Sequence, residues 1–161
     1  MLIEPYLLSM AGEFRVCSEL NKRGVFATIT YGHHKSVDLY AISGSKHLAL
    51  KIEVKTSQKA KFVTNLGKKD LETTPDFWVL CQILKVSHEQ FDERFFILTH
   101  LEICKIQAER SSKYCESYLK KNGKPFDPKN GVDSVRINDV AEHEGRWDKI
   151  ITRIAQAKIV I

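Results

Sequence analysis

Residues 37–55 constrain the fold more than any other stretch, because polar and apolar side chains alternate along most of it. Successive side chains of a β-strand point to opposite faces, so a strand of this kind buries one face and leaves the other polar. In the second half, the apolar set is Leu48, Leu50, Ile52 and Val54, and the charged set is Lys51, Glu53 and Lys55. The first half alternates in the same way, with Val37, Leu39 and Ala41 on the side opposite Asp38. The stretch predicts two strands of a half-buried sheet.

Between the two halves, residues 43–46 read Ser-Gly-Ser-Lys, a small and polar composition typical of a hairpin loop. A loop of these four residues sets Ile42 opposite His47, and therefore Asp38 opposite Lys51. Asp38 then becomes a diagonal neighbour of Glu53 on the same face, with the two backbones roughly 7–8 Å apart. A slip of one residue would move Asp38 to the other face, so the prediction depends on the loop length.

Two carboxylates that converge on one face are suited to a hard divalent cation. Magnesium takes oxygen ligands, usually one or two carboxylates completed by water and substrate phosphate. We expect Asp38 and Glu53 to supply the carboxylates and the carbonyl of Val54 a further oxygen. Lys55 could then orient or deprotonate a water, or stabilise charge on phosphate. The alternative is that Glu53 and Lys55 are ordinary solvent-facing residues of an exposed strand, since E-x-K often occurs by chance.

The pattern D-x14-E-x-K on a hairpin, preceded by a helix that carries Gly12-Glu13, resembles the PD-(D/E)XK nuclease superfamily. That superfamily includes many restriction enzymes and the archaeal-type Holliday junction resolvases, and the resemblance runs from Gly12 to Ser57. Val37 stands where the name-giving proline would be, whereas E-x-K is intact. The resemblance implies a restriction endonuclease-like α/β core and a metal-dependent endonuclease that hydrolyses DNA phosphodiester bonds with Mg²⁺ or Mn²⁺. It also implies that Glu13 completes the catalytic site with Asp38, Glu53 and Lys55.

The length and composition fit a single domain spanning residues 1–161. Of the residues, 43% are hydrophobic, which is enough to bury a core without disulfides or structural metal. The net charge of +5 and the pI near 9.0 suit a polyanionic partner such as DNA, although many basic proteins bind no nucleic acid.

The four cysteines show neither C-x-x-C nor zinc-ligand spacing, so we expect free thiols and a reducing, cytoplasmic setting. They are Cys17, Cys81, Cys104 and Cys115. The first ten residues lack a basic segment and carry Glu4 and Pro5, so neither a signal peptide nor a membrane span is expected there.

A first helix is predicted from about residue 5 to residue 23, ended by Gly24. At 100° per residue an apolar arc forms that also contains Glu13, whereas Glu19 points the opposite way. The arc comprises Leu7, Met10, Ala11, Phe14, Cys17 and Leu20. Two interpretations of Glu13 remain open: a role in a metal site or its water shell, or a lysine pair or solvent contact at the edge of the arc.

Polar and basic residues flank the hairpin where a phosphate backbone would run. They are His33, His34 and Lys35 before it, and Ser57, Gln58, Lys59, Lys61, Lys68 and Lys69 after it. The alternative is a pair of solvated loops.

The remaining pattern completes an α/β fold with a mixed sheet of four to five strands flanked by helices. Strands are expected at residues 25–30, 76–84, 95–98 and 134–137, with a polar turn at 87–94. Helices are expected at 100–121, broken near Ser111 and Ser112, and after Gly145, with Trp147 in the core. The apolar residues 159–161 predict a packing surface such as a homodimer interface.

Two functions compete with a nuclease. One is a nucleic-acid-binding module that keeps the nuclease fold without catalysis, and the other is an interaction protein that binds its partner through the apolar carboxy terminus. The acidic pair argues against the binding module, because a binder gains nothing from carboxylates aimed at phosphate.

Overall fold

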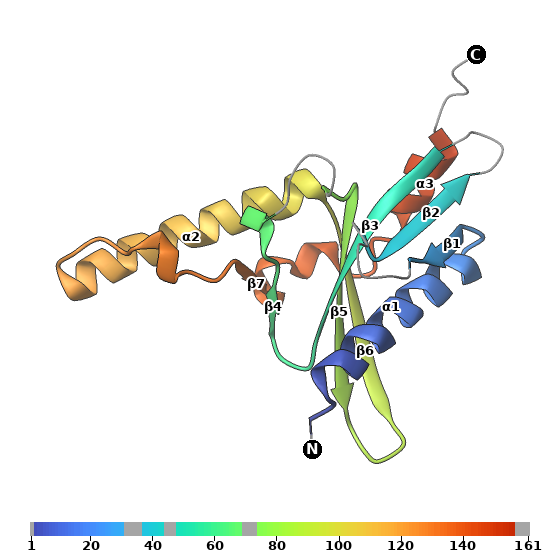
Figure 1. Ribbon diagram of the computed structural model, residues 1–161, viewed down its shortest axis with the longest axis horizontal. Coiled ribbons are helices and arrows are strands. Elements are labelled where there is room, and N and C mark those ends of the chain that lie inside the picture. The colour runs from blue at the N-terminus through green and yellow to red at the C-terminus, as the bar shows by residue number, and fades with distance from the viewer. Residues whose placement is uncertain (1, 31–36, 44–47, 69–73, 157–161) are drawn as a thin grey trace.

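The computed structural model describes residues 2–30, 37–43, 48–68 and 74–156. Its centre is a five-stranded mixed sheet in the order β1-β2-β3-β5-β6, in which only β3 and β5 are parallel (Figure 1). The strands are β1 (Phe26–Ile29), β2 (Leu39–Ser43), β3 (Leu48–Ser57), β5 (Phe77–Lys85) and β6 (Phe91–Thr99). The predicted mixed α/β fold is therefore confirmed.

The two faces of the sheet are covered by different elements. Helices α1 (Pro5–Lys22) and α3 (Asp148–Gln156) pack on one face, where Val16, Leu20 and Ile150 join one core with apolar residues of β2, β3 and β5. The start of α2 (His100–Asn122) covers the other face of β5 and β6 through Ile103. The strand pattern dictates this arrangement, because alternate residues of β5 enter opposite cores: Val79 the first, Trp78 and Leu80 the second.

The second core includes a small two-stranded sheet formed by β4 (Lys61–Val63) and β7 (Ser134–Arg136). Phe62 and Val135 lie opposite each other in this sheet and are buried. The sequence predicted β7 but placed the residues of β4 in a polar loop. That prediction was wrong because Lys61 and Val63 are exposed, so a single buried phenylalanine marks the strand.

Helix α1 has the predicted bounds to within one residue, but its buried face is not the predicted apolar arc. The buried residues are Leu8, Gly12, Glu13, Val16, Glu19 and Leu20, whereas Leu7 and Phe14 are exposed. Glu19 was expected on the side opposite the apolar arc, and it is buried among Arg15, Lys22 and Arg23, which form ion pairs with it. Burial alone would raise the pKa of Glu19, but hydrogen bonds from Lys22 and Arg23 outweigh it and lower the pKa.

Two other predicted boundaries need correction. Helix α2 runs without a break through Ser111 and Ser112, from a capping box at Thr99 and Glu102 to a left-handed Gly123. Strand β6 begins at Phe91, so the predicted polar turn is shorter than expected. Its charged residues extend a hairpin with β5, and two of them are paired: Glu93 with Arg15, and Arg94 with Glu144.

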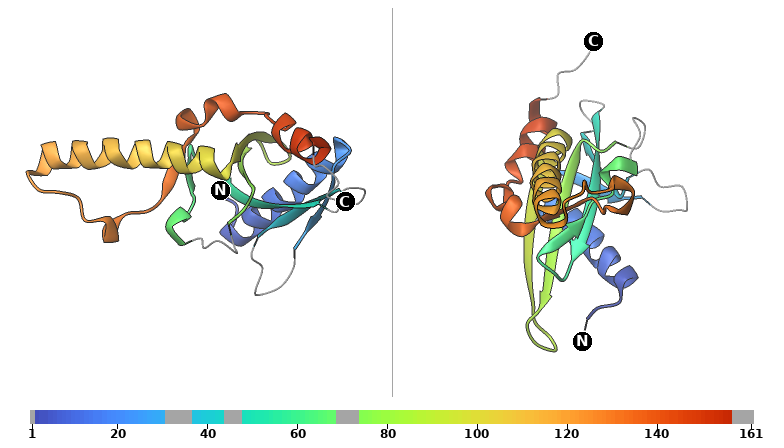
Figure 2. Two further views of the ribbon diagram at one scale, coloured as in Figure 1. Left: turned by 90° about the horizontal axis from the view of Figure 1, so that it is seen from above. Right: turned by 90° about the vertical axis from the view of Figure 1, so that its left-hand side faces the viewer.

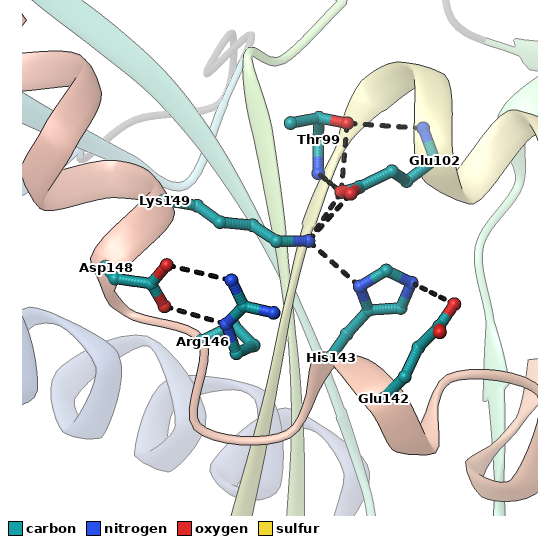
Figure 3. Close-up of polar contacts among 7 residues, drawn as sticks. All are labelled: Thr99, Glu102, Glu142, His143, Arg146, Asp148 and Lys149. Carbon is teal, nitrogen blue, oxygen red and sulfur yellow. Dashed lines mark hydrogen bonds and ion pairs between the residues drawn. The ribbon is translucent and has the colours of Figure 1, made fainter.

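A polar cluster of Glu102, His143 and Lys149 joins helix α3 to the start of α2 (Figure 3). The Lys149 ammonium donates to both carboxylate oxygens of Glu102 at 2.8 Å and lies 2.9 Å from Nδ1 of His143. Next to this cluster Trp147 is buried against Phe95, with ring centroids 5.5 Å apart, which confirms its place in the core.

All four cysteines are free thiols, as predicted, and burial raises the pKa of Cys81 to about 12.

Among the described residues, no helix has the length and apolar character needed to cross a bilayer. The tail at residues 159–161 lies outside the described residues.

Candidate active site

Asp38 lies directly before β2 and contacts β3 next to Glu53. The strands pair with Ser43 opposite Leu48 and Leu39 opposite Ile52, and the amide of Asp38 donates to the carbonyl of Ile52. The predicted register, with Asp38 opposite Lys51, was wrong by two residues, because Ser43 still pairs within β2 and Ile42 lies opposite Ala49. A shift of two residues keeps every paired side chain on its face. The carboxylate of Asp38 reaches β3 at Val54, the residue after Glu53.

The carboxylate of Asp38 is held by the backbone of β3. Its Oδ2 accepts a hydrogen bond from the amide of Val54 at 2.8 Å, and its own amide donates to the carbonyl of Ile52 at 3.2 Å. In a strand, the N–H and C=O of one residue point to the same side. The Val54 carbonyl therefore points toward the β2 side of β3, where Asp38 lies, as a ligand of a shared ion would.

Lys55 and Glu53 form an ion pair on one face of β3, with Nζ 2.6 Å from Oε1. The Glu53 side chain is 6% exposed and that of Lys55 is 27% exposed, so the pair is largely shielded from water. An ion pair in such surroundings is stronger than one on an open surface. The lysine thus contacts the carboxylate that the sequence assigned to the metal.

Trp78 accounts for part of this shielding and was not singled out from the sequence. It pairs with Glu53 in the parallel β3–β5 register, so the two side chains share a face, and it is fully buried. Its indole nitrogen donates to Nδ1 of His100 at 3.1 Å. Asp76, just before β5, fixes the neighbouring backbone, because its Oδ2 accepts from the amide of Lys51 at 2.7 Å. The hydrogen-bond partners of Asp76 and Trp78 lie 25 and 22 positions away in the sequence, so no local spacing marks these residues.

Glu13 is 4% exposed on α1, which packs on the other face of the sheet. The helix approaches β3 closely at Gly12, where an added Cβ would lie 1.8 Å from Oγ1 of Thr56. By strand alternation, Thr56 faces away from Glu53 and Lys55. Within the described residues, no three His, Cys, Asp or Glu side chains form a group that could hold a metal. Glu13 is therefore not gathered with Asp38 and Glu53 into one such group, and its catalytic role stays a prediction.

Of the residues expected to contact nucleic acid, those near the end of β3 differ in whether their side chains already form hydrogen bonds within the protein. Gln58 bonds both polar groups of Ile3, donating to its carbonyl and accepting from its amide at 3.1 Å. The hydroxyl of Ser57 accepts from the amide of Lys59 at 3.0 Å. Lys59 and Lys61 are exposed and available to a phosphate backbone. His33, His34, Lys35 and Lys69 lie outside the described residues, and Lys68 ends a short 3-10 turn.

A shallow depression of about 520 Å³ lies elsewhere, between the amino-terminal segment and the end of β5. It is lined by Leu2, Gln58, Leu84, Lys85, Val86 and Ser87, none of which belongs to the acidic pair. The chemistry of the site therefore rests on Asp38, Glu53 and Lys55 and not on this depression.

Comparison with known proteins supports the architecture. The structure of a bacterial homing endonuclease matches with a TM-score of 0.54 over 96% of this chain and 96% of the other, at 12% sequence identity. No protein-family model matches the sequence, and no curated protein matches it either. At this identity the similarity is one of fold, and it shows that the chain adopts a nuclease-like α/β fold.

Proposed function

We propose that this protein is a metal-dependent endonuclease of the PD-(D/E)XK type that hydrolyses DNA phosphodiester bonds. One observation carries the proposal: the Asp38 carboxylate is held at the amide of Val54, which lies between Glu53 and Lys55 in β3, and the ammonium of Lys55 pairs with Glu53. A nuclease-like fold and a net charge of +5 support it.

The donor set fits a hard divalent cation such as Mg²⁺ or Mn²⁺. Asp38 and Glu53 are 9% and 5% exposed, and buried carboxylates are strongly disfavoured unless cations or hydrogen bonds compensate their charge. Lys55 supplies one positive charge for the pair. Asp38, Glu53 and the Val54 carbonyl would hold the ion, matching the oxygen ligands these cations take. When bound, it would acidify a water and neutralise charge on the phosphate.

The chain's own residues have separate roles in this proposal. The Val54 amide orients the Asp38 carboxylate. Lys55 reaches the Glu53 carboxylate from the same strand and would place its ammonium beside a scissile phosphate, where it stabilises developing negative charge or orients the water. Trp78 excludes water from one side of Glu53, which strengthens each of these electrostatic interactions.

Cleavage of plasmid DNA tests the proposal. The purified protein is expected to cut supercoiled DNA with Mg²⁺ or Mn²⁺ and not in EDTA. Asp38→Asn and Lys55→Met are each expected to lower the rate by about 100-fold or more, as loss of a key electrostatic group does. Lys85→Met, an exposed lysine at the end of β5, is the matched control and is expected to cut at the wild-type rate. Cutting that survives both active-site substitutions would contradict the mechanism.

A second candidate is a DNA-binding module on the same fold without catalysis. The ion pair between Lys55 and Glu53 favours it, because the lysine already compensates one carboxylate without a metal. Salt-sensitive DNA binding with no metal-stimulated cutting would identify this function.

A further inference from the structure

The far part of helix α2 is built as an arm with little contact to the body. Its last buried residue is Gln107, and residues 108–122 continue for about 22 Å at 1.5 Å per residue. Figure 1 shows this part of α2 extending away from the central sheet. We refer to residues 108–129, which include the segment returning toward β7, as the arm. A helix without a buried face gains no stability from a core, so the arm needs local support.

An aromatic cluster at the end of the arm provides that support. Phe126 of the returning segment packs edge-on against Tyr114 and Tyr118, with centroid distances of 5.0 Å and 5.2 Å. Gly123 adopts the left-handed conformation that ends the helix, and Asp127 caps the turn Pro128–Asn130. The chain therefore folds back on itself at a defined place, and the arm presents a fixed surface.

The surface of the arm is basic. It carries six basic and three acidic side chains, and its last ten residues hold four lysines against the single acid Asp127. No ion pair among the described residues engages any of these four, which are Lys120, Lys121, Lys124 and Lys129. The carboxylate of Asp127 accepts a hydrogen bond from the amide of Lys129, so it caps the turn Pro128–Asn130. Within the part of the chain that the structure describes, the arm thus ends in a group of cations that form no ion pairs.

The positive charge continues from the arm toward the candidate site. Strand β7 leads back from the arm and sets Arg136 opposite Lys61 of β4, and both residues are exposed. Like charges directly opposite on a sheet are unfavourable unless an anion lies between or near them. Lys61 follows Lys55 by six residues, which is at most about 20 Å along an extended chain. A polyanion bound at the site could therefore meet Lys61, Arg136 and then the arm.

We infer that the arm is a second contact for the phosphate backbone of duplex DNA, outside the catalytic site. This inference rests on the proposed function and extends it, because it assigns a second part of the molecule to the same DNA. The charge favours DNA over a second copy of this chain, since interfaces between protein subunits are depleted of lysine. Tyr114 and Leu119 are the exposed large hydrophobic residues of the arm, too few for a stable dimer contact.

The test compares DNA binding by two variants that lose the same charge. Lys120→Gln/Lys124→Gln neutralises the arm and keeps residues with good helix propensity at position 120. Lys85→Gln/Arg153→Gln neutralises exposed residues on β5 and α3. The affinity for a labelled duplex of about three helical turns is measured in EDTA, so that no cutting occurs, at several salt concentrations. Light scattering gives the mass of each variant, and circular dichroism shows that each is folded.

We expect the arm variant to bind about 10–100-fold more weakly, with the slope of log affinity against log salt reduced by about two. The control variant should bind like the wild type. Equal affinity and slope for the two variants would overturn the inference, as would a wild type that does not bind DNA. A fall in mass of the arm variant at unchanged DNA affinity would also overturn it and identify a self-association surface.

The same samples separate this inference from the proposed function. If the wild type binds through the arm but never cuts with Mn²⁺, the enzyme proposal fails and the arm inference stands. If the arm variant binds and cuts like the control, the inference fails and the enzyme proposal stands.

Discussion

Asp38 combines two tasks in one side chain, a structural hydrogen bond and the proposed binding of a metal ion. Its Oδ2 accepts from the Val54 amide inside the protein, where a donor without an acceptor is costly. An alanine substitution removes the ligand and this acceptor together, so a loss of activity would not distinguish the two tasks. Asparagine removes the charge and keeps an oxygen for the amide.

We predict that Asp38→Ala lowers the free energy of unfolding by about 1–3 kcal/mol, because the Val54 amide loses its partner. Asp38→Asn should lose less than half of that amount while abolishing metal-dependent cutting. Urea denaturation of the two variants and the wild type measures the difference. Equal destabilisation by both substitutions would show that the charge, and not the hydrogen bond, stabilises this position.

His143 makes the stability depend on pH. Burial and the nearby Lys149 ammonium lower the pKa of His143 below 6.5, although Glu102 and Glu142 oppose the shift. Lys149 donates to Nδ1, which requires an unprotonated nitrogen there. A depressed pKa in the folded state means that the stabilisation is present above pH 6.5 and is lost as the pH falls through the lowered value.

We predict that the wild-type melting temperature falls as the pH is lowered from 7 toward 5, and that His143→Gln shows a flatter profile over this range. The lowered pKa values of Glu19 and Glu102 act only below the usual carboxyl value of 4.5, so they do not contribute in this window. Calorimetry at several pH values gives both profiles. Parallel profiles for the two proteins would contradict the assignment to His143.

At the scale of elements, the packing of α1 on β3 depends on Gly12. An added Cβ would lie 1.8 Å from Oγ1 and 2.9 Å from Cβ of Thr56. In an exposed helix, replacing glycine by alanine would raise the stability by about 1 kcal/mol. At Gly12 the clash with Thr56 outweighs this gain, because the helix must move away from the strand that carries Glu53 and Lys55.

We predict that Gly12→Ala destabilises the protein by about 1–3 kcal/mol, as overpacking of a core does. Thr56→Ala removes a buried hydroxyl that has no hydrogen-bond partner among the described residues, and it should be close to neutral alone. The double variant should recover part of the loss, since the 2.9 Å contact with Cβ remains. A double-mutant cycle measured in urea tests this, and purely additive effects would contradict the contact.

The strands were easier to predict from the sequence than the faces of the helices. The alternation of Leu50 and Ile52 with Lys51 follows from burial of one face, and the structure confirms it, although Glu53 on the charged face is buried as well. The burial of α1 does not follow from its apolar residues. Gly12 is buried because of close backbone packing and Glu19 because three basic residues surround it. Neither cause appears in a helical projection of hydrophobicity.

The paired residues of β2 and β3 kept their predicted faces although the register was wrong, because the error was an even number of residues. Alternation fixes the face, whereas the loop fixes the register, and the loop composition allowed two placements. Strand β4 could not be predicted because its partner β7 lies more than 70 residues later. Only this distant pairing gives Phe62 its buried position.

At the scale of the whole molecule, the proposed site lies beside the second core. That core covers β5 and β6 with the start of α2 and the β4–β7 sheet, and among the described residues it includes none of β2 or β3. Figure 2 shows α2 extending from one side of the molecule, with the other helices gathered around the sheet. Glu53 and Lys55 pair with Trp78 and Leu80 of this core, so they lie on the face of the sheet that carries it.

The most direct test of the central claim is the anomalous diffraction of crystals soaked with Mn²⁺. We predict one strong peak within coordination distance of the Asp38 and Glu53 carboxylates, about 2.1–2.3 Å from their oxygens as oxygen-ligated divalent ions require. The peak should disappear in Asp38→Asn crystals of the same form. A manganese ion bound elsewhere, with none at this pair in a protein that cuts DNA, would contradict the claim that Asp38 and Glu53 hold the catalytic metal.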